Sequence, residues 1–354
     1  MAAFNPRMLT LARESRGWTQ GALAERSGVS QPYISRIEKG LKEPTPEKLN
    51  ALAGALRYSP EALTLEEPVL GVDALFHRRL KTIPVTVLRQ DQAQINLRRI
   101  QTRRLLQGIE FDAPNTFPRL DVDEVGGPVE AARLVRRAWR IPFGPIGSVV
   151  ACLEDAGGVV VPMRFQTPRV SAAALWPRED RRPMFFINAD HNGERQRFTL
   201  SHELGHMVLH DVPEPEYEDQ ADTFAAEFLM PEREIRPQLE AHRLNLARLL
   251  HIKLHWRVSM SAVVKRAETL GVVSERKARS LWQMLSARGF RDREPFPIDP
   301  EQPTLLRAAI SLHQQQHRYT AGELAAVAMV KEDEFSAAFP VAGGGQRRFR
   351  VVRD

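Results

Sequence analysis

The chain contains a single cysteine, Cys152, and it lacks any long apolar run. One cysteine cannot form an intrachain disulfide or a cysteine-rich zinc module, so we expect it to pack as a small apolar residue in a reducing compartment. The segment from Met1 to Arg16 has no basic start followed by an apolar stretch, as a secretory leader needs. No apolar segment approaches the roughly 20 residues that span a bilayer. These absences predict a soluble, cytoplasmic protein.

Neither sign of charge dominates the composition. The chain has 50 lysines and arginines against 44 acidic residues, which gives a net charge of +6. This modest excess permits contact with nucleic acid without requiring it. With 354 residues, of which 43% are hydrophobic and 27% charged, the chain is long enough for two or three domains with separate cores.

Residues 5–64 predict a unit of short helices: 6–16, 20–26, 31–38, 45–56 and one more after Ser59-Pro60. Thr19 and Ser30 suit helix N-caps, and Gly28 suits the positive φ of the turn between the second and third helices. A helix-turn-helix places the start of its third helix in the major groove. DNA contacts are therefore expected from Gln20, Ser30, Gln31, Tyr33, Ser35 and Arg36. The alternative is a helical bundle that serves only for protein contacts.

The stretch from Phe76 to Arg104 is basic and contains the single acid Asp91. Apolar spacing after Pro84 suits a helix, so residues 67–109 are predicted to form a basic helical connector. The preferred interpretation is a solvated helix face between domains. A surface that contacts phosphate or a partner protein is the alternative.

A second chemical signature lies within 198–206, where the pattern His-Glu-x-x-His falls in an apolar helical context. His202 and His206 are four residues apart, so both imidazoles can face one metal ion from the same side of a helix. Glu203 lies beside them, where it can accept a proton from a metal-activated water. This pattern predicts a zinc hydrolase site with Glu203 as the general base.

A catalytic zinc ion takes three protein ligands and leaves one position open. Glu218 is the predicted third ligand, from a helix at 217–229, and Asp222 shares its face. Asp222 is predicted to accept a hydrogen bond from the second nitrogen of a ligand histidine. Asp219 and Glu227 are weaker candidates because they fall on other faces. Zn²⁺ is the predicted ion, and Mn²⁺ or Fe²⁺ also accept two imidazoles and a carboxylate.

The remaining polar residues near this motif leave several roles open. Tyr217, His210 and Arg197 are all candidates to stabilise an oxyanion, and the sequence does not choose among them. His210 is interpreted as a partner or surface residue, because three ligands from one helix would be geometrically unusual. Strands are predicted at 159–165, 172–176 and 184–188, and the last of these is a candidate sheet edge for an extended substrate.

Two sets of motifs resemble known families. Thr19-Gln20, Ser27 to Ser30, Ile34 to Gly40 and Pro44-Thr45 resemble the Xre/Cro-repressor class of helix-turn-helix. Arg197 to His206, together with Ala221 to Pro231, Trp256 to Met260 and Lys265 to Ala267, resembles the ImmA/IrrE metallopeptidase family. In this sequence Gln220 stands where many relatives carry an acidic residue, which leaves Glu218 as the better-placed carboxylate. The fusion to a DNA-binding unit is also a variation, since the simplest members act on a separately encoded repressor.

The predicted fold is multidomain and mainly α. It comprises an all-α helix-turn-helix domain at 1–66, the connector at 67–109, an α+β zincin-like metallopeptidase domain with a small sheet at 110–290, and a helical tail at 291–354.

The resemblance implies a metal-dependent endopeptidase that cleaves a helix-turn-helix repressor in a stress response or in mobile-element induction. It assigns the roles above to His202, Glu203, His206 and Glu218. Operator-type double-stranded DNA, a protein substrate and a homodimer are the expected partners. Two alternatives are a transcriptional regulator or antitoxin whose peptidase-like domain senses or docks without proteolysis, and self-cleavage within 76–104.

Overall fold

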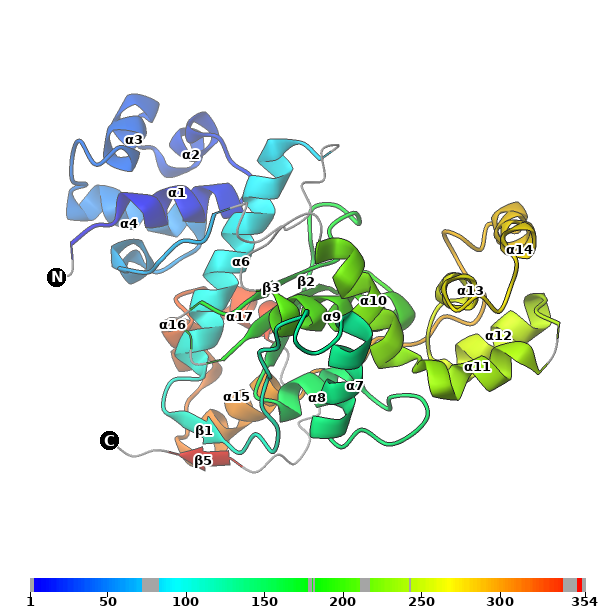
Figure 1. Ribbon diagram of the computed structural model, residues 1–354. Coiled ribbons are helices and arrows are strands. Elements are labelled where there is room, and N and C mark those ends of the chain that lie inside the picture. Colours follow the sequence, from blue (N-terminus) through cyan, green and yellow to red (C-terminus); the bar gives the residue numbers. More distant parts are fainter. Residues whose placement is uncertain are drawn as a thin grey trace. The chain divides into compact units, whose positions relative to one another are not determined.

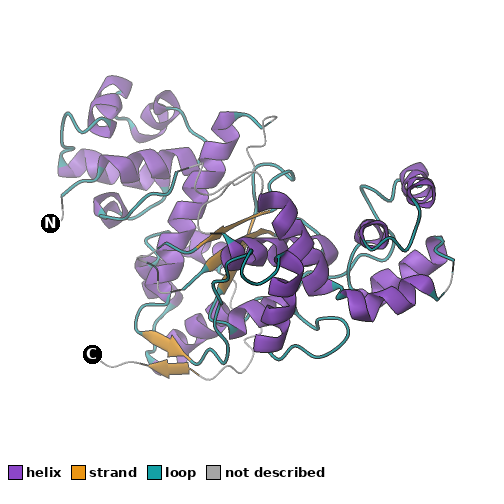
Figure 2. Ribbon diagram, in the orientation of Figure 1, coloured by secondary structure: helices purple, strands orange, loops and turns teal. Residues whose placement is uncertain are grey.

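A computed structural model describes residues 3–71, 83–177, 180, 182–210, 217–241, 243–339 and 349–351. The chain divides into two compact units, and Figure 1 labels their helices and strands. Unit 1 comprises 1–112, 165–167 and 304–354, and unit 2 comprises 113–164 and 168–303. Helices dominate both units (Figure 2), so the prediction of a multidomain, mainly α protein with a small sheet is confirmed. The four predicted domain boundaries stay a prediction.

Unit 1 begins with the predicted series of short helices: α1 (Pro6–Ser15), α2 (Gln20–Ser27), α3 (Gln31–Glu38), α4 (Pro46–Leu56) and the 3-10 helix η1 (Pro60–Thr64). The Thr19 side chain caps α2 by accepting from the N–H of Ala22, and Gly28 ends that helix with a φ of 70°. Ser30 occupies the N-cap position of α3, although its side chain makes no capping hydrogen bond. Fully buried leucines and isoleucines from α1 to α4 form the core of this helical domain.

Helix α6 (Val85–Leu105) lies where the sequence predicts a connector helix, but the interpretation as a solvated face is wrong. Its buried positions include both apolar and polar residues, among them Asp91, Asn96, Arg99 and Ile100. The arginines there bind backbone carbonyls within unit 1: Arg99 donates to Pro68, Arg104 to Val327 and Arg98 to Ala338. The helix is thus a central element of unit 1. Arg78, Arg79 and Lys81 lie outside the described residues.

The C-terminal helices α15 (Leu305–Gln316), α16 (Ala321–Val327) and α17 (Glu332–Ala338) also belong to unit 1. The short β1 (Ile109–Phe111) pairs antiparallel with β5 (Phe349–Val351), and the sequence predicted neither these strands nor α17. Glu334 of α17 forms ion pairs with Arg16 at 2.8 Å and Arg57 at 2.7 Å. These contacts attach the C-terminal helices to the helix-turn-helix domain.

Asp91 makes the stability of α6 depend on pH. One carboxylate oxygen accepts the Gln166 N–H at 2.9 Å, and the other has no hydrogen-bond partner among the described residues. Burial raises the pKa of Asp91 from 3.8 to about 6, although the Gln166 hydrogen bond opposes the shift. Between these values the folded state holds a proton that the unfolded state has lost, so stability falls as pH rises through this window.

We therefore expect Asp91→Asn to slow hydrogen exchange of the α6 amides above pH 6, because the amide removes a desolvated charge. Near pH 3.8 and below, where the wild-type carboxyl is protonated in both states, this benefit should disappear. Exchange measured across the pH range tests the expectation. A difference between variant and wild type that does not change with pH would contradict it.

Unit 2 is built on a three-stranded sheet in the order β2-β4-β3. Strand β4 (Met184–Asn188) runs parallel to β2 (Val159–Met163) and antiparallel to β3 (Ala172–Leu175). All five residues of β4 are buried. The expectation that this strand offers a free edge to substrate is wrong, because it is paired on both sides. The outer strands of this sheet are β2 and β3.

Unit 2 also contains a series of helices, among them the predicted helix at 217–229. They are α7 (Pro128–Ala138), α8 (Val149–Asp155), α9 (Gly193–Leu209), α10 (Tyr217–Leu229), α11 (Glu232–Glu240), α12 (Leu246–Trp256), α13 (Met260–Thr269) and α14 (Glu275–Ala287). Cys152 on α8 is partly buried, and burial raises its thiol pKa to about 11. Of the helices in the described part of the chain, none combines the length and hydropathy that a membrane crossing requires.

Candidate metal centre

Helices α9 and α10 carry the predicted metal ligands and pack tightly against each other. The Asn192 side chain caps α9, and Leu200, Leu204 and Val208 anchor this helix in the core of unit 2. Gly205 lies at a close approach of the two helices. A Cβ atom there would lie 3.2 Å from the Ala221 Cα and 3.2 Å from the Phe224 Cβ. The absence of a side chain at residue 205 therefore allows α10 to bring its carboxylates close to α9.

The substitution Gly205→Ala should push α10 away from α9. Overpacking against the backbone outweighs the helix propensity gained from alanine, for a net loss of about 1–2 kcal/mol in the free energy of unfolding. Zinc affinity should fall as well, because Glu218 moves with α10. Denaturant unfolding and zinc titration measure these effects.

Gly54→Ala on α4 is the matched control, because no atom lies within 4 Å of its added Cβ. This variant should gain about 0.5–1 kcal/mol, from helix propensity alone. Equal stabilisation by both substitutions would show that Gly205 does not set the distance between α9 and α10.

His202, His206 and Glu218 offer three ligand atoms that all lie within 4.8 Å of one another. The two Nε2 atoms are 3.0 Å apart. The Glu218 carboxylate oxygens lie 3.8 Å from Nε2 of His202 and 3.6 Å from Nε2 of His206. The structure thus brings the predicted ligands of α9 and α10 to one point.

Asp222 holds the orientation of His202. Its carboxylate oxygen lies 2.7 Å from the Nδ1 atom of His202 and can only accept, so Nδ1 donates and Nε2 keeps its lone pair. Burial tends to lower the pKa of His202, but the Asp222 hydrogen bond and the charges of Glu203 and Glu218 raise it overall. Two imidazole nitrogens and one carboxylate form the donor set that a catalytic zinc ion takes, so these residues fit the metal.

Glu203 is nearly buried beside these ligands, with 9% of its surface exposed. Its Oε2 atom is buried and has no hydrogen-bond partner among the described residues. An unsatisfied buried carboxylate oxygen is costly, and it commonly marks a functional position. This geometry suits a general base that accepts a proton from a water molecule.

The other acidic residues considered as metal ligands, Asp219 and Glu227, are not part of this cluster. Asp219 is exposed on α10. Glu227 is fully buried and binds Arg266 and Arg133, the latter at 2.7 Å. This places Glu227 in a structural ion-pair network rather than among the metal ligands.

Two of the residues considered for stabilising an oxyanion, Arg197 and His210, have partners within the protein. Arg197, one of the three open candidates, is buried and binds Glu301 and the carbonyl of Ile146, so these partners hold its guanidinium within the fold. The His210 ring stacks on Tyr217 with centroids 4.2 Å apart, and its nitrogens face His206 and Gln220. Sequence reasoning missed this arrangement, although the spacing of His206 and His210 was visible.

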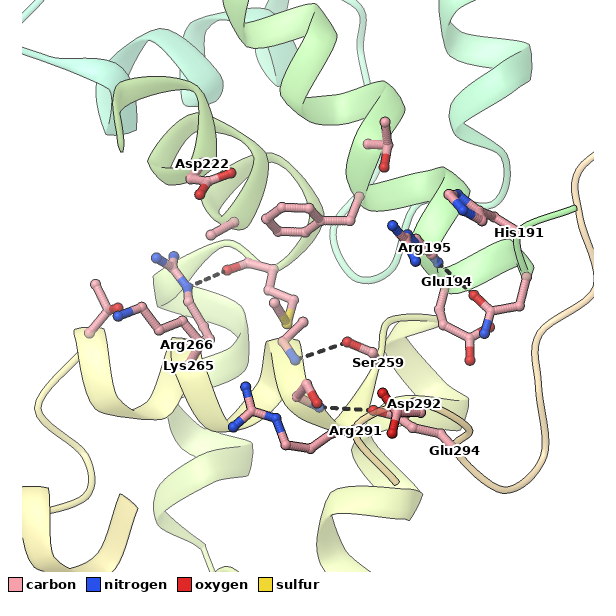
Figure 3. Close-up of a pocket in the computed structure, with 18 of the residues that line it drawn as sticks. His191, Glu194, Arg195, Asp222, Ser259, Lys265, Arg266, Arg291, Asp292 and Glu294 are labelled. Atoms are coloured by element: carbon pink, nitrogen blue, oxygen red, sulfur yellow. Dashed lines mark hydrogen bonds between the residues drawn. The ribbon is translucent and has the colours of Figure 1, made fainter. Parts of the chain in front are cut away.

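A cavity of about 880 Å³ lies in unit 2 beside Asp222 (Figure 3). Its lining includes Asp222 of α10, Phe198 of α9 and Lys265 of α13, together with Arg291, Asp292 and Glu294. In Figure 3, Asp222 and Lys265 lie on one side and His191 and Glu194 on the other. The metal ligands themselves do not line this space, so it adjoins the centre through Asp222.

The predicted DNA-contacting residues do not all share one surface. Ser30, Gln31 and Arg36 are exposed, and Ser35 is half-buried. Gln31 donates to the Gln20 side chain at 2.9 Å, which joins α3 to α2. Tyr33 is buried, unlike the other predicted DNA-contacting residues.

The Tyr33 side chain is buried in the core, and its hydroxyl donates to the carbonyl of Glu43. The ammonium groups of Lys42 and Lys48 lie over its ring. Tyr33 therefore packs within the helical domain, and Gln31 and Arg36 are the residues best placed for contacts outside the protein.

Two family models match this chain. Residues 153–268 match a peptidase family model described as the IrrE N-terminal-like domain, and residues 9–63 match the model described as helix-turn-helix. The resemblance drawn from the motifs is thereby confirmed: the chain carries a helix-turn-helix domain followed by an IrrE-like domain.

Similar proteins include an uncharacterized HTH-type transcriptional regulator of Mycobacterium tuberculosis strain CDC 1551 / Oshkosh. It is 39% identical over 85 residues, which cover 24% of this chain and 61% of the relative. A second such regulator, from strain ATCC 25618 / H37Rv, gives the same values. The chain thus spans less than two thirds of the length of these relatives.

Proposed function

We propose that the protein is a metal-dependent endopeptidase that carries its own DNA-binding domain and cleaves a transcriptional regulator. The observation that carries the proposal is the convergence of His202, His206 and Glu218 beside a buried oxygen of Glu203 that has no hydrogen-bond partner in the described part of the chain. A structural ion-pair cluster has no need of an unsatisfied carboxylate at this position. The match to a peptidase family model over 153–268 supports the same reaction class.

His202, His206 and Glu218 would hold the metal, and Zn²⁺ is the ion that suits this donor set best. When bound, such an ion supplies Lewis acidity and increases the acidity of a water molecule. Glu203 accepts the proton of the attacking water and passes it to the leaving amine. Asp222 keeps His202 in the tautomer whose Nε2 faces the other ligands.

The surroundings of this centre support a peptide as the substrate. An extended peptide can add to an outer strand of the sheet, and β2 or β3 is the strand available for that pairing. The cavity beside Asp222 can receive side chains of either charge, since both Lys265 and Asp292 line it. We infer that the substrate is a protein regulator, in keeping with a helix-turn-helix repressor.

The helix-turn-helix domain would hold the enzyme at double-stranded DNA, where such a regulator also binds. Gln31 and Arg36 are exposed on α3 and can contact base edges or phosphates, with Gln20 supporting Gln31. A homodimer on a two-fold operator suits this domain class, and a stress signal or mobile-element induction is the proposed trigger.

The test is incubation of the full chain with Zn²⁺ or Mn²⁺ and with proteins encoded by neighbouring genes. A regulator fragment seen by mass spectrometry, and lost on addition of a chelator, supports the proposal. A fragment of the chain itself would instead indicate self-cleavage within 76–104, part of which lies outside the described residues. The absence of any metal-dependent cleavage would contradict the enzymatic assignment.

A second candidate function is a transcriptional regulator or antitoxin whose IrrE-like domain senses or docks without proteolysis. The similarity to two Mycobacterium tuberculosis proteins named as HTH-type transcriptional regulators favours it. A purified sample that contains no metal by elemental analysis but binds an operator tightly would select this function over the first.

A further inference from the structure

We propose that His210 is a positioning residue for the metal ligand His206, and that Gln220 fixes the proton of His210. This inference rests on the proposed function, and it explains what holds the second histidine ligand, His206, in its orientation. His202 is oriented by the Asp222 carboxylate, whereas His206 is oriented by the imidazole of His210, which in turn contacts the amide of Gln220.

Two successive hydrogen bonds connect the side chains of His206, His210 and Gln220. Nδ1 of His206 lies 2.9 Å from Nδ1 of His210. Nε2 of His210 lies 3.0 Å from the amide oxygen of Gln220. His206 and His210 are only 6% and 9% exposed, so water competes little for these hydrogen bonds. The ring of Tyr217 stacks on His210 at an interplanar angle of 7° and holds it in plane.

The direction of each hydrogen bond follows from the Gln220 oxygen, which can only accept. A neutral His210 therefore carries its proton on Nε2, which leaves its Nδ1 as an acceptor. His206 then donates from Nδ1, and its Nε2 keeps a lone pair. Since Asp222 imposes the same tautomer on His202, both Nε2 lone pairs converge where Glu218 also approaches.

His210 is neither an exposed surface residue nor another metal ligand. It contacts the Nδ1 atom of His206, while the Nε2 atom of His206 faces His202. Partners of this kind orient metal-bound histidines, and their loss commonly weakens metal affinity by about 10- to 100-fold. Gln220 comes from α10 and His210 ends α9, so the arrangement also depends on how these helices pack.

The experiment measures Zn²⁺ affinity of the full chain by competition with a chromophoric chelator. His210→Phe retains an aromatic ring against Tyr217 but removes both nitrogens, and it should weaken binding by about 10- to 100-fold. Gln220→Glu replaces the amide by a stronger acceptor and should tighten binding. Substitution of the exposed His251 by Phe, on α12, is the matched control and should leave affinity unchanged.

A second measurement uses ¹⁵N NMR of histidine side chains in the metal-free protein. Wild type should show His206 protonated on Nδ1 and His210 on Nε2, and His210→Phe should lose that fixed tautomer at His206. Wild-type affinity and a wild-type tautomer in His210→Phe would overturn the inference. If the wild-type chain binds no zinc, the proposed function fails, and the tautomers still decide whether His210 positions His206.

Discussion

Replacement of Glu203 by glutamine is expected to lower peptide cleavage by about 10²- to 10⁴-fold while the metal stays bound. Glutamine has the same shape as glutamate but cannot accept a proton from the attacking water. The fold should tolerate the change, because Oε2 of Glu203 has no hydrogen-bond partner to lose among the described residues. A loss of cleavage without a loss of structure would therefore report on chemistry alone.

The measurement compares wild type, Glu203→Gln and Glu203→Ala on the same substrate, with metal content determined by elemental analysis. Both variants should keep the metal near the wild-type level, since the ligand atoms belong to His202, His206 and Glu218. The glutamine variant should also retain bound substrate and allow its capture. Cleavage at the wild-type rate by either variant would falsify the assignment of the general base.

Local patterns were enough to predict most elements of the helix-turn-helix domain. The helices α2 and α3 each begin where the sequence places them, because caps and apolar spacing are encoded by neighbouring residues. Tyr33 was assigned to the DNA surface by its position on α3, but its ring packs inward against the core. An amphipathic aromatic residue can take either side of a short helix, and tertiary packing decides between them.

The misinterpretation of α6 has a different cause. Its many arginines suggested a solvated face, since isolated charges are costly to bury. Their carbonyl partners come from distant segments, however, such as Val327 for Arg104 and Ala338 for Arg98. A single sequence shows no trace of such long-range partners, and the same reason explains why β1 and β5 were not predicted.

The candidate site could be predicted in part. Spacing of four residues on a helix places His202 near His206 and Glu218 near Asp222, and the two pairs meet because α9 packs on α10. The role of His210 could not be predicted, because it depends on ring rotation and on Gln220 from another helix. The close approach at Gly205 likewise requires knowledge of what lies opposite.

Glu218 and Glu227, both on α10, should respond in opposite ways to the same substitution by glutamine. Glu227 is 1% exposed, binds Arg266 and Arg133, and accepts the N–H of Glu232. Removal of one partner from a buried ion pair leaves an uncompensated charge, so Glu227→Gln should lower the free energy of unfolding by about 3–5 kcal/mol. Its metal affinity in the folded state should remain close to that of wild type.

Glu218→Gln should instead spare stability and weaken zinc binding strongly, because its carboxylate is the only anionic ligand of the three and is partly exposed at 22%. Denaturant unfolding of the metal-free chain and zinc competition separate the two effects. A loss of zinc affinity in Glu227→Gln with unchanged unfolding would reverse the assignments and make Glu227 the ligand. The expected result is a loss of zinc affinity in one variant and a loss of stability in the other. Because both carboxylates belong to α10, this result would distinguish the metal site from the neighbouring ion-pair network.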